Sequence, residues 1–121
     1  MYEAVVLTEQ SRRLLLQLFK PKYSRVVAHH VTTAFGVRRN ESANYGALVP
    51  LSVVGYACED GVEALVVEID NTTIRADKRT YHITLSLDVD KKPVMSNTLL
   101  KGGWCIKYTP IPIEGTFEYI Q

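Results

Sequence analysis

Two short stretches of the sequence place a histidine two residues before a threonine. In AHHVTTAF His30 precedes Thr32, and in TYHITLSL His82 precedes Thr84. Both stretches are rich in β-branched and aromatic residues, which favour strands, and residues two apart in a strand point to the same face. We therefore expect each histidine to share one face of a sheet with its threonine.

Two imidazoles and two hydroxyls in one groove suit phosphodiester chemistry. A histidine that titrates near neutral pH can accept a proton from water, and a second can donate a proton to the leaving oxygen. Threonine hydroxyls can donate to the phosphate oxygens on which charge develops in the transition state. The sequence thus predicts a phosphodiesterase without metal or cofactor, with His30, Thr32, His82 and Thr84 as catalytic residues. Which histidine is the base and which the acid stays open.

The elements that hold these residues follow from the hydrophobic pattern and the turn signals. Thr8 and Glu9 predict a helix start, and Pro21 stops the one main helix, expected over 9–20. The dipeptide DG at 60–61 predicts a hairpin. Ser96 or Asn97 is expected to cap a short helical turn that a glycine ends. Strands are expected at 2–7, 26–35, 48–58, 62–70, 80–88, 104–108 and 115–120.

Strands that outnumber helices in this way predict one α+β domain over residues 1–121. We expect a compact, mostly antiparallel sheet, with helix on one face and the two HxT motifs on neighbouring central strands facing a groove.

The composition limits the kinds of partner that the protein is expected to bind. A net charge of +1 and a pI near 7.8 give no basic face for long-duplex nucleic acid, but they allow a nucleotide or a strand end. Cys58 and Cys105 are expected to be buried free thiols of a cytoplasmic protein. No apolar run is long enough for a membrane span, so no membrane partner is expected.

Other side chains are candidates for substrate binding. Arg38 follows the first motif and could contact a phosphate, although a solvated loop is the simpler explanation. Tyr45 could stack on a base. Lys101 could face an anion or complement a helix C-terminus. The adjacent His29 is expected on the opposite, core-side face, because its neighbour at +2 is Val31.

Metal and thiol chemistry are not predicted. The histidines and cysteines lack the close paired spacing of a structural zinc site. Neither Cys58 nor Cys105 has the basic or helix-start context that activates a thiol.

The paired HVT and HIT resemble the signature of the two-histidine phosphoesterase superfamily, which includes RNA cyclic phosphodiesterases. The segments AHHVTTAFG, VVGYACEDGVEALVVEI and YHITLSLDVDKKPVMSNTLL look like core segments of its compact branch, the cyclic phosphodiesterase domain of tRNA ligases. The resemblance covers residues 26–100. The two histidines are only 52 residues apart, a shorter interval than in many relatives.

The resemblance implies a phosphoric diester hydrolase that opens 2',3'-cyclic phosphates on RNA ends or nucleotides, as in RNA processing. Two alternatives stay open. One is a phosphodiesterase that degrades cyclic nucleotide or oligonucleotide signals, as phages do when they counter host defence. The other is a nucleotide or RNA-end binding module without turnover.

Overall fold

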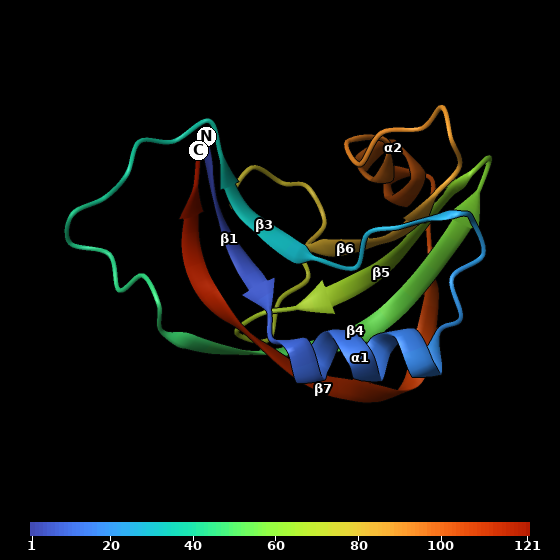
Figure 1. The fold of residues 1–121 in the computed structure, drawn as a ribbon, viewed down its shortest axis with the longest axis horizontal. Helices are drawn as coiled ribbons and strands as arrows, with labels where there is room; N and C mark the ends of the chain where they lie inside the picture. Colours follow the sequence, from blue (N-terminus) through green and yellow to red (C-terminus); the bar gives the residue numbers. More distant parts are fainter.

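The computed structural model describes the chain from Met1 to Gln121, apart from the side chain of Tyr108. Figure 1 shows a strongly curved sheet with one helix below it and a second above it. In chain order the elements are β1 (Tyr2–Leu7), α1 (Glu9–Leu18), β2 (Arg25–Val26), β3 (His30–Phe35), β4 (Leu48–Glu59), β5 (Val62–Glu68), β6 (His82–Leu87), α2 (Met95–Lys101) and β7 (Cys105–Ile120).

The strands form one sheet in the order β2-β6-β5-β4-β7-β1-β3, and every pair is antiparallel. Over the described residues this makes seven strands and two short helices, which confirms the predicted α+β class. The hairpin is also confirmed. Asp60 and Gly61 both have positive φ, as a two-residue turn between twisted strands requires.

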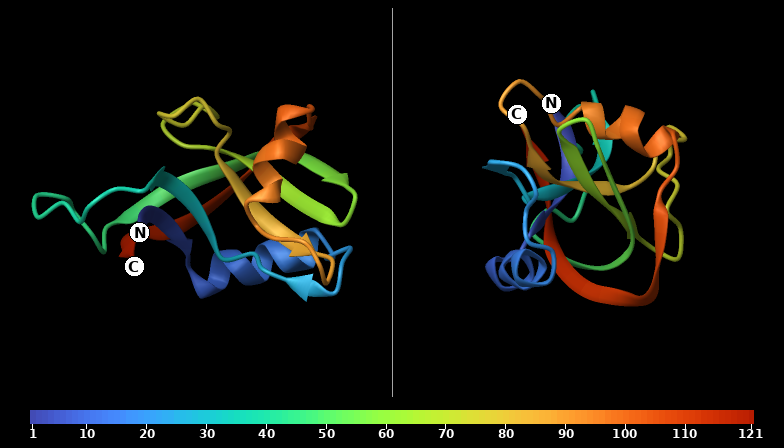
Figure 2. Two further views of the ribbon diagram at one scale, coloured as in Figure 1. Left: turned by 90° about the horizontal axis from the view of Figure 1, so that it is seen from above. Right: turned by 90° about the vertical axis from the view of Figure 1, so that its right-hand side faces the viewer.

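The sheet rolls until its two ends meet. The segment predicted as one strand over 26–35 is two strands, because the backbone turns at Ala28, whose φ is 44°. Before the turn the segment pairs with β6, and the amide of Ala28 donates to the carbonyl of Thr84. After the turn it pairs with β1. Figure 2 shows the resulting rounded cross-section.

Each face of the sheet has its own core. Alternate residues of the strands pack with Leu15 of α1 in the larger core, which includes Val31, Ile83 and Leu85. On the other face Leu100 of α2 packs with residues of β4 and β5. Because both faces are covered, β5 is buried from Val62 to Val67. The predicted single helix-covered face is therefore wrong: the second helix covers part of the other face.

The two terminal strands predicted at 104–108 and 115–120 are one strand, β7. Its middle contains Pro110 and Pro112. β7 pairs with β4 at 105–106 and again from 111 to 116, and residues 107–110, which include Pro110, form a break in this pairing. The neighbour β1 joins on the other side only from Gly115. Proline is tolerated on such an edge, where its missing N–H has no partner to lose.

The helices begin and end close to the predicted points. The hydroxyl of Thr8 accepts a hydrogen bond from the amide of Ser11 and caps α1, which ends before Pro21. Neither helix of the described residues has the length and apolarity needed to cross a membrane. Both cysteines are free, but neither is buried as predicted: Cys58 is half-buried and Cys105 is exposed.

Candidate active site

The first motif opens β3. Val31 is fully buried in the α1 core, so His30 and Thr32 on either side of it share the opposite face, as the alternation predicts. The turn at Ala28 ends the pairing with β6 and lets His30 begin the pairing with β1. The motif therefore sits where the chain crosses from one end of the sheet to the other.

A β-bulge at Thr33 reverses the alternation in the second half of β3. Thr32 and Ala34 pair with successive residues of β1, which leaves Thr33 without a partner. The extra residue turns the following side chains over. Strict alternation from His30 would place Phe35 on the opposite face, but with the bulge it lines the same cavity and is 68% exposed.

The second motif lies in β6. Ile83 and Leu85 are fully buried in the α1 core, and His82 and Thr84 point to the other face. The hydroxyl of Thr84 is hydrogen-bonded to that of Ser96, with 2.8 Å between the oxygens, and Thr84 Oγ1 lies 3.5 Å from the carbonyl oxygen of Pro93. Thr84 is thus held from the α2 side.

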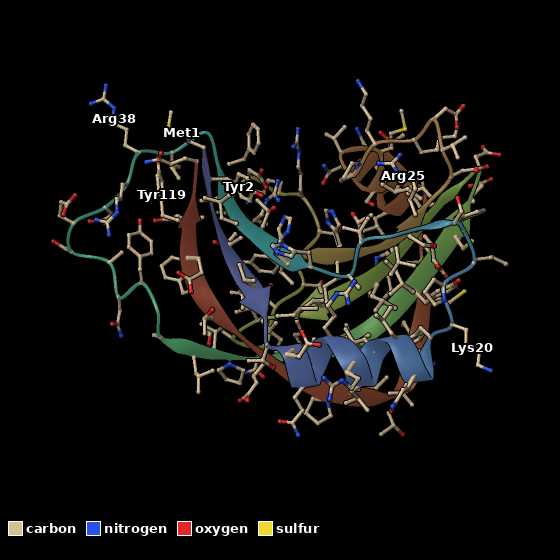
Figure 3. The ribbon with its side chains drawn as sticks, in the orientation of Figure 1. Met1, Tyr2, Lys20, Arg25, Arg38 and Tyr119 are labelled. Atoms are coloured by element: carbon tan, nitrogen blue, oxygen red, sulfur yellow. The ribbon has the colours of Figure 1, made fainter. Side chains whose placement is uncertain are left out.

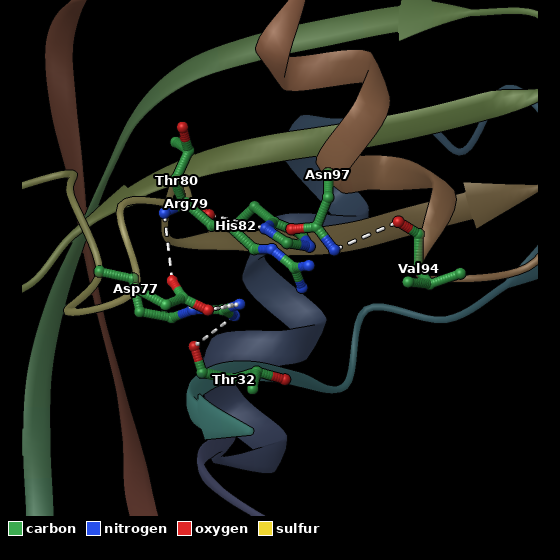
Figure 4. Close-up of polar contacts among 8 residues, drawn as sticks. Thr32, Asp77, Arg79, Thr80, His82, Val94 and Asn97 are labelled. Atoms are coloured by element: carbon green, nitrogen blue, oxygen red, sulfur yellow. Dashed lines mark hydrogen bonds and ion pairs between the residues drawn. The ribbon is translucent and has the colours of Figure 1, made fainter. Parts of the chain in front are cut away.

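The predicted capping roles in α2 are wrong. The N-cap is Val94, and Ser96 is fully buried inside the first turn, where it contacts Thr84. The Asn97 amide nitrogen donates to the carbonyl of Val94 at 3.2 Å (Figure 4). Ser96 therefore faces β6, and Asn97 faces the cavity beside it.

The two motifs line one cavity of about 280 Å³. They do so although β3 ends the strand order and β6 is next to its other end, so the prediction of neighbouring central strands is wrong. The roll of the sheet brings the two strands together. With His30, Thr32, His82 and Thr84, the lining comprises Tyr2, Val27, Phe35, Arg75, Arg79, Pro93, Val94 and Asn97.

A backbone hydrogen bond determines which ring nitrogen of His82 carries the hydrogen. Its Nδ1 lies 2.8 Å from the carbonyl oxygen of Thr80, which can only accept, so Nδ1 carries the hydrogen (Figure 4). Nε2 is then the atom that takes up or releases a proton. Burial lowers the pKa of His82 below its ordinary value of 6.5, and the charges of Arg75 and Arg79 lower it further, while the bond to Thr80 acts in the opposite direction.

The side chain of His30 contacts that of a second histidine, His29. The Nδ1 atoms of His29 and His30 lie 2.9 Å apart, and the rings meet edge to face. Burial, with smaller effects of His29 and His82, lowers the pKa of His30 to about 4. His29 is exposed beside His30 and is not on the core side as predicted. The alternation fails because His29 precedes β3, directly after the turn at Ala28.

The cavity has a cationic wall from the loop between β5 and β6. Arg75 is only 3% exposed, and its Nη2 and Nε donate to the two carboxylate oxygens of Asp77 at 2.7 and 2.9 Å. This contact lowers the pKa of Asp77 to about 2. Arg79 extends from the same loop toward His82 (Figure 4). No aspartate or glutamate is among the residues that line the cavity in the described part of the chain.

The structure places Arg38 and Tyr45 outside this cavity. Both belong to the long loop between β3 and β4, and Arg38 is exposed at a distance from the site (Figure 3). The hydroxyl of Tyr45 donates to the carboxylate of Glu3 at 2.7 Å, and its ring stacks on Phe117. Tyr45 therefore anchors the loop instead of presenting a free face to a base.

Lys101 lies in an adjoining cavity. It ends α2 and lines a hollow of about 440 Å³ with Asp77, Lys78, Arg79, Thr80, Asn97 and Thr98.

The sequence analysis missed Arg75, Arg79, Tyr2 and Phe35. A signal for Arg79 was present, since it lies only three residues before His82. Tyr2 contacts the ring of His30 with 5.4 Å between centroids, a contact that requires the pairing of β1 with β3. The position of Arg75 depends on how the loop between β5 and β6 folds back, which no pattern in the sequence predicts.

In the described part of the chain, no three histidine, cysteine, aspartate or glutamate side chains form a group that could hold a metal ion. No family model, curated protein or solved structure matches the chain.

Proposed function

We propose that this protein is a phosphodiesterase that hydrolyses 2',3'-cyclic phosphates on nucleotides or RNA ends. The observation that carries the proposal is the meeting of His30, Thr32, His82 and Thr84 in one cavity with a cationic wall and no carboxylate in its lining. Such a wall attracts a phosphodiester anion, and the resemblance of the motifs to the two-histidine phosphoesterases points to the same chemistry.

His30 serves as the base. Its low pKa keeps it neutral at physiological pH, so it can take a proton from water as the water oxygen attacks phosphorus. His82 serves as the acid. Burial lowers its pKa, but the bond from its Nδ1 to Thr80 acts in the opposite direction and favours the protonated ring. As the bond between phosphorus and one ribose oxygen breaks, Nε2 gives that oxygen a proton. The product is a phosphate monoester.

Hydroxyls and guanidinium groups stabilise the charge on phosphorus. Thr32 donates to one non-bridging oxygen. Thr84 donates to the other and in turn accepts from Ser96, whose hydroxyl is 2.8 Å away. Arg79 offers further donors from the loop. At the cavity wall, Tyr2 and the exposed Phe35 provide aromatic faces on which a base can stack.

The test is hydrolysis in EDTA, with His30→Ala and His82→Ala beside the unchanged protein. The panel holds a nucleoside 2',3'-cyclic phosphate, an RNA oligomer ending in one, a 3',5'-cyclic mononucleotide and a cyclic dinucleotide. We expect turnover of the first two, and a loss of about 10² to 10⁴ in rate for each variant. Circular dichroism checks that both variants fold.

Other outcomes separate the alternatives. Turnover of only a 3',5'-cyclic mononucleotide or a cyclic dinucleotide would replace the proposed substrate with a signalling nucleotide. Binding without turnover in the unchanged protein would leave a recognition module, and a full rate in either histidine variant would contradict the paired-histidine mechanism.

A further inference from the structure

The hollow that contains Lys101 adjoins the proposed active site. Arg79 and Asn97 line both cavities, so the second hollow, of about 440 Å³, continues from the first along the gap between α2 and the loop before β6. Figure 4 shows Arg79 and Asn97 side by side between these two elements. A ligand in the first cavity would therefore reach the second past the side chains of Arg79 and Asn97.

The charges of this second hollow are unbalanced. Lys78, Arg79 and Lys101 contribute three cations, and Asp77 is the one carboxylate among its described lining residues. Both carboxylate oxygens of Asp77 already accept hydrogen bonds from the buried Arg75. None of the salt bridges found among the described residues involves the three cations.

This concentration of charge contrasts with the whole chain, which has 14 basic and 13 acidic residues. Cations gathered beside a phosphate site, with their nearest carboxylate occupied, suit a second anion. Lys78 has a φ of 74°, a conformation rare in residues other than glycine, and the loop retains it through hydrogen bonds between Arg75 and both Lys78 and Arg79.

We propose that the second hollow binds the phosphate next to the scissile one, so that the preferred substrate carries two phosphates joined through a ribose. The proposal rests on the proposed function for its first site. It selects a strand end or a cyclic dinucleotide over a nucleoside 2',3'-cyclic phosphate, and it gives Lys78 and Lys101 the role of holding the second phosphate.

The experiment compares Lys78→Ala/Lys101→Ala with the unchanged protein on three compounds: a nucleoside 2',3'-cyclic phosphate, a dinucleotide that ends in one, and a cyclic dinucleotide. We expect KM for a compound with two phosphates to rise on the order of fivefold, as for the loss of two exposed ion pairs. Its kcat should stay unchanged, because the contacts to the scissile phosphate remain. KM for the single-phosphate compound should not change.

The control removes the same charge elsewhere. Lys20 and Lys22 are exposed on the segment after α1, far from both cavities (Lys20 is labelled in Figure 3). Lys20→Ala/Lys22→Ala should leave all three KM values unchanged. An equal loss in both double variants, or an equal change for one- and two-phosphate compounds, would overturn the second site.

The proposed function and the second site can fail separately. If the unchanged protein hydrolyses none of the compounds, the proposed function fails, and the same compounds are titrated for binding. Tighter binding of a two-phosphate compound that Lys78→Ala/Lys101→Ala abolishes would still support the second site. Equal binding of one- and two-phosphate compounds would reject it. Whether the dinucleotide end or the cyclic dinucleotide gains affinity identifies the source of the second phosphate.

Discussion

At the scale of single residues, the two histidines differ in what their Nδ1 atoms contact. His82 donates to a carbonyl, which can only accept, so its Nδ1 keeps a hydrogen in both charge states. His30 contacts the Nδ1 of His29, a group that can hold a hydrogen itself. Because only one hydrogen lies between these two nitrogens, protonating both rings would break the contact. The charge of His29 also lowers the pKa of His30, which favours the neutral form that the base requires.

This difference predicts an acidic optimum for kcat/KM, which reports the ionisations of the free enzyme. The rate should rise as His30 loses its proton near pH 4 and fall as His82 loses its proton below pH 6.5. The measurement is kcat/KM for a 2',3'-cyclic phosphate from pH 3.5 to 8 at constant ionic strength, within the range in which the protein stays folded. A rate that stays constant from pH 5 to 8 would contradict the lowered pKa of His82.

The residual rate of His30→Ala assigns the roles. If His30 is the base, that rate should only fall as the pH increases, because His82 must still supply a proton. A residual rate that instead rises through the same range would make His82 the base and His30 the acid.

At the scale of elements, two polar loops of similar composition differ in whether they reach the site. The loop of 36–47 supplied the predicted Arg38, and the loop of 70–79 supplies Arg75 and Arg79. The second loop is folded back by bridges between Ile69 and Thr72 and between Ile74 and Thr80, whereas the first extends away from the body (Figure 1). Both loops are polar in the sequence, and neither their composition nor their spacing shows which of the two folds back to the site.

The contact between Arg75 and Asp77 holds the second loop in place. Asp77→Ala leaves the guanidinium of Arg75, which is 3% exposed, without its carboxylate, and an unpaired buried charge is costly. We expect the free energy of unfolding to fall by about 1 to 3 kcal/mol and KM to rise, because Arg79 belongs to the same loop. Urea unfolding gives the first quantity and steady-state kinetics the second.

Glu41→Ala is the matched control. It also removes a carboxylate paired with an arginine, Arg39, but both side chains are more than half exposed. We expect a change of less than about 1 kcal/mol. Equal effects of Asp77→Ala and Glu41→Ala would mean that the loop is not held by its buried arginine.

At the scale of the whole molecule, the site depends on how the sheet closes. Local pattern was sufficient for the antiparallel α+β class, the hairpin at Asp60 and the shared face of each histidine and threonine, because these depend on neighbouring residues. Strand order was not predictable in this way. The motifs meet because the segment 25–35 pairs with β6 before Ala28 and with β1 after it. The bulge at Thr33, invisible in the sequence, adds Phe35 to the cavity.

Because the site forms only when the whole sheet closes, its activity should be lost together with the fold. A substitution at Gly115 tests this prediction. It lies in β7 between Val49 of β4 and Leu7 of β1, and a Cβ there would collide with the carbonyl oxygen of Val6. Because backbone cannot yield as a side chain can, we expect Gly115→Ala to destabilise the fold by about 1 to 3 kcal/mol. Activity and the fluorescence of Trp104, the one tryptophan in the sequence, should shift to the same lower urea midpoint.

Gly102→Ala supplies the comparison, since Gly102 has a helical backbone and its added Cβ would meet nothing closer than 3.4 Å. Neither midpoint should fall in this variant. Equal stability of Gly115→Ala and the unchanged protein would refute the close approach of β7 to β1. Activity that disappears well before the Trp104 signal would show that the two motifs separate without unfolding of the sheet. Coincident midpoints would instead tie the cavity to the closure of the whole sheet, as expected for motifs near opposite ends of one strand order.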